Sequence, residues 1–127
     1  MARAKKRSIL LIDQDAHALS IYEKRFETAG WKVVRAKNFQ EGKKKLVRAL
    51  PDVILVDLHP LTESIAFLEE LSKDPAMASI VCVVLTDVGD RRTIKEVESL
   101  GVSAYMLKGH SFPSEVIRKV KSFYEKK

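Results

Sequence analysis

Polar side chains follow four of the apolar runs in this sequence, each at the point where a run ends. They are Asp13, Gln14 and Asp15 after the first run, Asp57 after the third, Thr86 and Asp87 after the fourth, and Lys108 after the fifth. In an open sheet of parallel strands, ligands bind beyond the carboxyl ends of the strands, which is where these residues would lie. Carboxylates, a hydroxyl and an ammonium group would then surround one cleft.

Five short apolar runs must position these side chains. Their first residues lie 22, 22, 27 and 24 positions apart. The runs are Ile9–Ile12, Trp31–Ala36, Val53–Val56, Ile80–Leu85 and Ala104–Leu107. They are continuous rather than alternating, which is typical of strands in a parallel sheet that is covered on both faces.

Segments with helical spacing of apolar residues separate these runs. The stripes are Leu19, Tyr22, Phe26 and Ala29; Phe39, Leu46 and Leu50; Ile65, Leu68 and Leu71; Ile94, Val97 and Leu100; and Val116, Val120 and Phe123. The helix signals are Asp15 and Asn38 as N-caps, Gly30 and Gly101 as ends, and Pro113 as a start. A strand followed by a helix, five times over, predicts a doubly wound α/β fold with a five-stranded parallel sheet.

The length of 127 residues suits a single domain with one core. We expect a basic N-terminal tail at residues 1–7 and the folded domain at residues 8–125. No apolar run is long enough to span a membrane, and the first run is too short for a signal peptide, so the expected location is the cytoplasm. The single cysteine, Cys82, lies in the run IVCVVL and is expected to be a core residue.

The formal net charge of +6 is unevenly distributed. Residues 1–50 contain 13 basic and 5 acidic residues, residues 51–100 contain 4 and 10, and residues 101–127 contain 6 and 2. A basic balance is compatible with nucleic-acid binding, but the basic residues are not interleaved with aromatic ones and show no recognition-helix pattern. We therefore expect solvated lysine-rich faces, with no specific binding of nucleic acid and no membrane association.

The order of the polar residues resembles that of the receiver domain of two-component response regulators. That family has an acid pair after the first strand, Asp after the third, Thr after the fourth and Lys after the fifth, and the resemblance covers residues 8–125, including the segment PDVILVDL. It implies a flavodoxin-like fold with five strands and five helices. It also implies that Asp57 accepts a phosphoryl group from a histidine kinase or a phosphotransfer protein.

The same resemblance assigns roles to the other residues at the strand ends. Mg²⁺ would take oxygen ligands, namely Asp13, Asp57, the backbone carbonyl of His59 and, as a weak ligand, Gln14. Lys108 would pair with one phosphoryl oxygen and Thr86 would hydrogen-bond another. Tyr105 matches the aromatic residue that changes rotamer when Thr86 shifts.

Several positions depart from the family pattern. They are Gln14 at the second acid position, Pro60 one place early, Ser64 or Ile65 where Gly is expected, Asp87 in place of a small residue, and Gly109 in place of a proline. Gln14 removes one anion from the metal site, so the affinity for Mg²⁺ should fall. Pro60 fixes its own φ and restricts His59, so the loop after Asp57 should be reshaped. Asp87 either replaces the charge that Gln14 lacks or points outward and repels phosphate.

Two functions compete most directly. The first is a stand-alone receiver that is phosphorylated on Asp57 and signals through contacts with other proteins. The second is a pseudo-receiver, a protein-binding module that keeps the fold and no longer depends on phosphorylation. A module that binds nucleic acid through the basic tails is a third alternative. An enzyme that acts on an external substrate is not expected, because the sequence has no His–Asp–nucleophile set and no Gly-rich phosphate loop.

Overall fold

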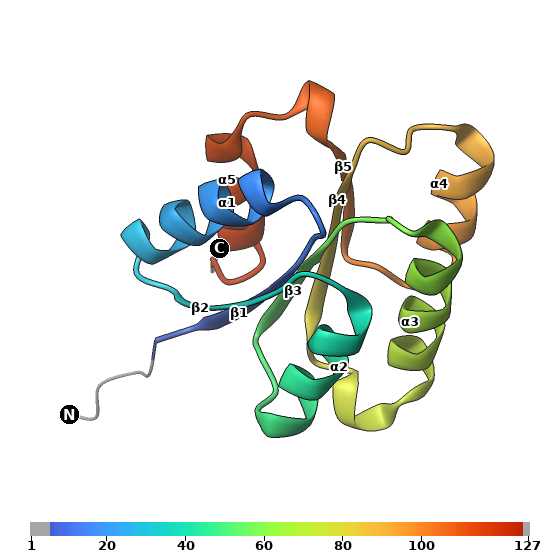
Figure 1. Cartoon of the computed structure of the whole chain (residues 1–127), viewed down its shortest axis with the longest axis horizontal. Helices are drawn as coiled ribbons and strands as arrows, with labels where there is room; N and C mark the ends of the chain where they lie inside the picture. The colour runs from blue at the N-terminus through green and yellow to red at the C-terminus, as the bar shows by residue number, and fades with distance from the viewer. Residues whose placement is uncertain (1–5, 126–127) are drawn as a thin grey trace.

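The computed structural model describes residues 6–125, in which five strands and five α-helices alternate (Figure 1). The strands are β1 (Ser8–Ile12), β2 (Lys32–Ala36), β3 (Val53–Val56), β4 (Val81–Thr86) and β5 (Ala104–Leu107). The helices are α1 (Ala16–Thr28), α2 (Phe39–Arg48), α3 (Leu61–Lys73), α4 (Arg91–Glu98) and α5 (Pro113–Ser122), and short 3-10 turns occupy Pro75–Met77 and Lys108–His110. All five predicted strands are present: β3 and β5 have the predicted ends, and the ends of β1, β2 and β4 differ by at most one residue.

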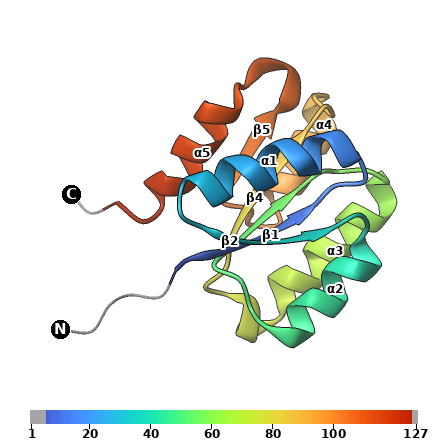
Figure 2. The same cartoon turned by 60° about the vertical axis from the view of Figure 1, so that its left-hand side comes forward.

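The strands form one parallel sheet in the order β2-β1-β3-β4-β5. Helices α1 and α5 cover one face of the sheet, and α2, α3 and α4 cover the other (Figures 1 and 2). Each face carries its own set of buried apolar side chains, because alternate residues of a strand point to opposite faces. The predicted doubly wound, flavodoxin-like fold is therefore confirmed.

The helix ends follow the signals in the sequence. The Asp15 side chain accepts hydrogen bonds from the backbone N–H groups of His17 and Ala18, and the Asn38 side chain accepts one from Glu41. Gly30 and Gly101 have φ values of 94° and 85°, which only glycine adopts without strain. Because Asp15 caps the helix, His17 lies in the first turn of α1.

Two side chains outside the strands extend the core. Trp31, expected as a strand residue, precedes β2 and packs edge-on against Phe26 and Tyr124, with ring centroids 5.7 and 5.9 Å apart. The Arg7 guanidinium lies over the Tyr124 ring, 4.0 Å from its centroid. Arg7, which the sequence placed in the basic tail, is thus in contact with the domain, whereas residues 1–5 of that tail lie outside the described residues.

Cys82 packs among apolar side chains of β4, and burial raises the pKa of its thiol to about 12. The thiol is therefore protonated at neutral pH, and the partly buried residue lies at the margin of the core rather than within it. Among the helices of residues 6–125, none is long and apolar enough to cross a membrane.

The N-cap of α4 should make part of the stability depend on pH. Asp90 accepts hydrogen bonds from the backbone N–H and the hydroxyl of Thr93, at 3.0 and 2.9 Å, and these bonds lower the pKa of Asp90 below 3.8. A lowered folded-state pKa adds stability above pH 3.8, and this stability is lost as the pH falls through the folded-state value. Asp90→Asn keeps an acceptor without the charge, so its melting temperature should fall less than that of the wild type on acidification.

The measurement is a thermal melt at neutral pH and at a pH well below 3.8. Asp90→Ala serves as the control, because it removes the cap at both pH values. Equal acid-induced shifts in the wild type and in Asp90→Asn would contradict the assignment.

Candidate functional site

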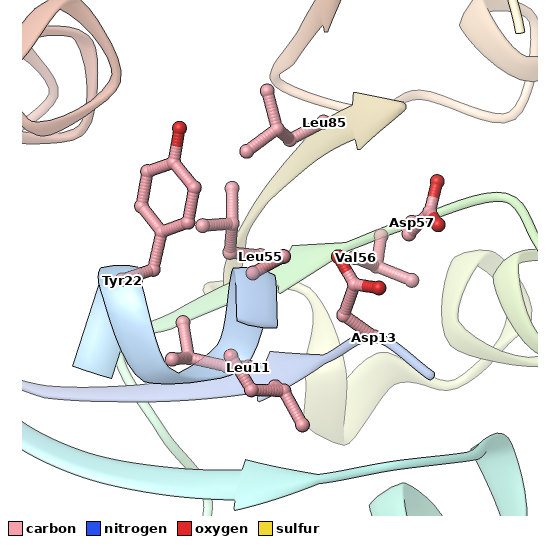
Figure 3. Close-up of a pocket in the computed structure, with 9 residues that line it drawn as sticks. Leu11, Asp13, Tyr22, Leu55, Val56, Asp57 and Leu85 are labelled. Atoms are coloured by element: carbon pink, nitrogen blue, oxygen red, sulfur yellow. The ribbon is translucent and has the colours of Figure 1, made fainter. Parts of the chain in front are cut away.

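The polar residues at the strand ends meet at the carboxyl edge of the sheet. Ile12 pairs with Val56 across β1 and β3, so the next residues, Asp13 and Asp57, leave the sheet side by side. Figure 3 shows both carboxylates just beyond the ends of two neighbouring strands, near the apolar side chains of Leu55 and Val56. Lys108 follows β5 directly, and Thr86 is the last residue of β4. The strand order therefore places Asp13, Asp57, Thr86 and Lys108 at the same edge of the sheet, as the sequence predicted.

A single ammonium group joins the two carboxylates. Lys108 Nζ lies 2.8 Å from Oδ2 of Asp13 and 3.5 Å from Oδ2 of Asp57. The side chains are largely removed from solvent, with 19% of Lys108 and 12% of each aspartate exposed. Charges in such a setting are screened less than surface charges, so this group is the main electrostatic feature of the site.

The protonation of Lys108 follows from its neighbours. Burial by itself would lower the pKa of Lys108, but the hydrogen bond and charge of Asp13, together with the charge of Asp57, outweigh burial and raise it. For Asp13, burial outweighs the hydrogen bond from Lys108 and raises the pKa of its carboxyl. Lys108 is therefore a cation at neutral pH, and the site holds a cation fixed beside Asp57.

Backbone groups orient the carboxylates. Asp13 Oδ1 accepts a hydrogen bond of 2.9 Å from the backbone N–H of Asp15, and Asp57 Oδ1 accepts one of 2.8 Å from the backbone N–H of Leu58. In both residues this leaves Oδ2 directed at Lys108. The local turn after each strand thus fixes the direction of the carboxylate that follows it.

Thr86 connects the site to Tyr105 through one residue. The buried Thr86 hydroxyl oxygen accepts long hydrogen bonds from the backbone N–H groups of Leu58, at 3.4 Å, and Val88, at 3.3 Å. The Tyr105 hydroxyl donates to the carbonyl of Val88. Burial raises the pKa of Tyr105 to about 12, so this phenol keeps its proton at neutral pH. Val88 is therefore held by Thr86 on one side and Tyr105 on the other.

Two of the positions that depart from the family pattern, Gln14 and Asp87, form no side-chain hydrogen bond or ion pair, among the described residues, with the group formed by Lys108 and the two aspartates. Gln14 is exposed and its side chain forms no hydrogen bond within the described range 6–125. Asp87 is also exposed, and no cluster of three or more His, Cys, Asp and Glu side chains that could hold a metal occurs in that range. Asp87 therefore does not replace the carboxylate that Gln14 lacks.

The loop after Asp57 has a shape of its own. The His59–Pro60 peptide bond is cis, and the His59 side chain is exposed. Pro60 precedes α3, and its carbonyl accepts hydrogen bonds from the backbone N–H and the hydroxyl of Ser64, at 3.0 and 2.6 Å. Ser64 is fully buried, so this hydroxyl bond closes the first turn of α3 in the absence of a side-chain cap.

The oxygen atoms at this edge of the sheet are of the type that bind a hard cation. Mg²⁺ prefers oxygen ligands and keeps several waters. Asp13 and Asp57 offer two carboxylates at one point, and the amide of Gln14 and the backbone carbonyl of His59 are oxygen donors on the adjoining loops. The set fits Mg²⁺ with two anionic ligands, and the Lys108 ammonium beside them is a competing cation.

One residue near the site was not anticipated. Tyr22 of α1 lines a small cavity beside the two carboxylates, together with Leu11, Leu55 and Leu85 (Figure 3). Its apolar neighbours explain why the sequence assigned it only to a core-facing stripe. Tyr22 shares the core-facing side of α1 with Leu19, which also lines this cavity.

Comparison with known proteins finds matches to response regulators. The family model described as response regulator receiver domain matches residues 9–121. The probable transcriptional regulator ycf27 of Guillardia theta is 30% identical over 92% of this chain and 45% of its own length. The phosphate regulon transcriptional regulatory protein PhoB of Pseudomonas aeruginosa is 27% identical over 91% of this chain and 51% of its own length. The chain thus spans about half the length of these relatives.

Solved structures share the fold. A CheY-like response regulator receiver domain protein from Methanospirillum hungatei superposes with a TM-score of 0.85 at 22% identity, covering 94% of both chains. A response regulator described as putative, from Chloroflexus aurantiacus, gives a TM-score of 0.83 at 24% identity, covering 93% of this chain and 97% of the other.

Proposed function

The chain belongs to the response regulator receiver family, and we propose that it accepts a phosphoryl group on Asp57 from a histidine kinase or a phosphotransfer protein. The observation that carries this proposal is the fixed cation: Lys108 Nζ lies within 3.5 Å of Asp57 and within 2.8 Å of Asp13. A carboxylate nucleophile and an anionic phosphoryl group repel each other, and a fixed cation between the carboxylates reduces that repulsion.

The transfer balances as a substitution at phosphorus. A carboxylate oxygen of Asp57 forms a bond to phosphorus while the P–N bond of the donor phosphohistidine breaks. The electron pair of that bond leaves with the imidazole nitrogen, and the product is an acyl phosphate on Asp57. Such transfers need alignment and charge neutralisation rather than further covalent chemistry from the protein.

Two other residues of the chain support this step. The Lys108 ammonium pairs with an oxygen of the transferred group, and the Thr86 hydroxyl hydrogen-bonds another. Asp13 and Asp57, with Gln14 and the His59 carbonyl, would hold Mg²⁺, which supplies further neutralisation of the negative charge when it is bound.

The signal would leave the site through Val88. When Thr86 turns to a phosphoryl oxygen, its bond to the Val88 N–H is lost, and the loop held by Tyr105 changes position. A ligand shifts a two-state equilibrium only through such differential contacts. The output is a contact with another protein.

The alternative is a pseudo-receiver that binds proteins without phosphorylation. It is favoured by the exposed Gln14 and by the absence of a third carboxylate from the site in the described part of the chain. In that case Lys108 would serve only to neutralise two aspartates that are largely removed from solvent.

The deciding experiment is incubation with a small phosphodonor and Mg²⁺, followed by intact mass measurement. We expect a single added phosphoryl group in the wild type and none in Asp57→Asn. A phosphorylated species that persists in Asp57→Asn would refute the acceptor assignment. No phosphorylation of the wild type, together with no spectral response to beryllofluoride, would favour the pseudo-receiver.

A further inference from the structure

The basic charge of the chain is concentrated in one strand–helix unit. Residues 31–50 contain seven lysines and arginines and one acidic residue, Glu41. This excess equals the formal net charge of the whole chain, +6, so the remaining residues are neutral in sum. This segment contains the edge strand β2 and the helix α2 that follows it in the chain.

Much of this charge is not neutralised by neighbouring residues. Arg35 pairs with Glu23, and Lys43 pairs with Glu70. The salt bridges found in residues 6–125 include none for Lys44, Lys45 or Arg48. Lys44 and Arg48 are four positions apart on α2, where like charges repel. An anionic partner would relieve this repulsion.

Two exposed apolar side chains lie in the last turn of α2 and just beyond its end. Val47 is 88% exposed and Leu50 is 51% exposed, although both are large apolar residues. A hollow of about 600 Å³ is lined by the acidic residue Glu41 and by five other residues, namely Val47, Arg35, Lys44, Lys45 and Arg48. We refer to these five residues as the α2 surface.

A second hollow adjoins the α2 surface on the side of α3. It measures about 230 Å³, and its apolar lining includes Leu46, Val47, Phe67, Leu71 and Met77. Lys43, Glu70 and Asp74 also line it, so the groove accepts the apolar side chain of a partner while the acidic groups of that partner lie toward the α2 residues. Val47 lines both hollows and therefore stands between the basic side chains and the apolar groove. A partner that fills both must carry negative charge next to an apolar side chain.

We propose that the α2 surface binds an acidic segment of another protein, with an apolar side chain of that segment packed against Val47 in the groove between α2 and α3. Charge complementarity selects an acidic partner. The apolar component favours a protein segment over a nucleic acid, since a phosphate backbone offers nothing to pack on Val47. One exposed valine and one exposed leucine also provide little apolar area for insertion into a membrane.

This surface is separate from the site at Asp57. The strands on either side of α2 are parallel, so α2 runs back from the carboxyl edge of the sheet to the amino edge (Figure 1). Val47 and Arg48 lie in its last turn, at the end away from Asp57. Binding there requires no phosphoryl group, so the inference does not depend on the proposed function.

The test uses the full chain labelled with ¹⁵N and a short synthetic peptide of Glu, Asp and Leu. We expect saturable shifts of the backbone amides of α2 and a loss of affinity as salt is added. The double variant Lys44→Glu/Arg48→Glu should weaken binding by about tenfold or more. It removes two exposed ion pairs with the peptide, each of which contributes less than the free energy of a tenfold change in affinity, and the reversed charges add repulsion. Val47→Ser, at a mostly exposed position, should weaken binding several-fold without unfolding the protein.

A matched control is available on another face. Lys119→Glu/Lys121→Glu in α5 changes the net charge by the same amount at exposed positions and should leave binding unchanged. Equal weakening by this control, or no shifts in α2, would overturn the proposal. It would also be overturned if a DNA duplex bound α2 more tightly than the peptide and Val47→Ser had no effect, or if the α2 residues served only to associate one copy of the chain with another.

Discussion

Replacement of Lys108 by methionine is expected to slow phosphorylation of Asp57 by about a hundredfold to a thousandfold while strengthening the binding of Mg²⁺. The rate falls because Lys108 is the fixed cation beside Asp57, and the loss of one such preorganised group has an effect of this order. Affinity for the metal rises because the ammonium and a divalent cation compete for the same two carboxylates. A gain of about tenfold would correspond to about 1.4 kcal/mol of repulsion removed.

The two effects are measured separately, by intact mass after incubation with a phosphodonor and by titration of Mg²⁺ followed through the backbone amide shifts of Asp13 and Asp57. Lys108→Arg keeps the charge and should retain unchanged metal affinity. Lys119→Met removes a charge at an exposed position of α5 and should change neither the phosphorylation rate nor the affinity for Mg²⁺. A Lys108→Met protein with weaker Mg²⁺ binding would show that the lysine orders the carboxylates rather than competing for them.

The fold was accessible from the sequence because its signals are local. The continuous run Val53–Val56 is buried along its whole length, as a strand covered on both faces must be. Asp15, Asn38 and Pro113 stand at the helix starts that they predicted. The expected strand beginning at Trp31 was less accurate, because a large aromatic ring contributes to the core without being in a strand.

The residues of the site could be predicted from the sequence, but the contacts between them could not. Strand order brings Asp13, Asp57, Thr86 and Lys108 together, and this follows from the resemblance to the family. The sequence does not show that Lys108 lies closer to Asp13 than to Asp57, because the difference depends on the turns that direct each carboxylate. The contact of Arg7 with Tyr124 is likewise a product of tertiary packing between the two ends of the chain.

The molecule thus presents two charged features at opposite edges of the sheet. At the carboxyl edge, Asp13 and Asp57 are neutralised within the chain by Lys108. Toward the amino edge, Lys44 and Arg48 have no such partner in the described residues.

The change of Gln14 to aspartate is expected to increase the affinity for Mg²⁺ by about tenfold, because it adds an anionic oxygen ligand beside Asp13. Below saturation, phosphorylation of Asp57 should accelerate in proportion to the increased occupancy, and at saturating Mg²⁺ the two rates should converge. Stability should change in the opposite sense without metal. Burial already raises the pKa of Asp13, so a second carboxylate nearby adds repulsion and should lower the melting temperature in the presence of a chelator.

Addition of Mg²⁺ should reverse that order, because a ligand that binds only the folded state stabilises it more as its affinity rises. Gln14→Asn keeps a neutral amide and is the direct control for shape, and Gln40→Asp adds the same charge at an exposed position of α2. Neither control should change the metal affinity. If Gln14→Asp and Gln14→Asn bind Mg²⁺ equally, the side chain at position 14 does not reach the metal, and the weak ligand proposed there must be removed from the site. If Gln14→Asp binds more tightly yet is phosphorylated no faster below saturation, the metal site is intact and the limitation lies in the loop reshaped by Pro60.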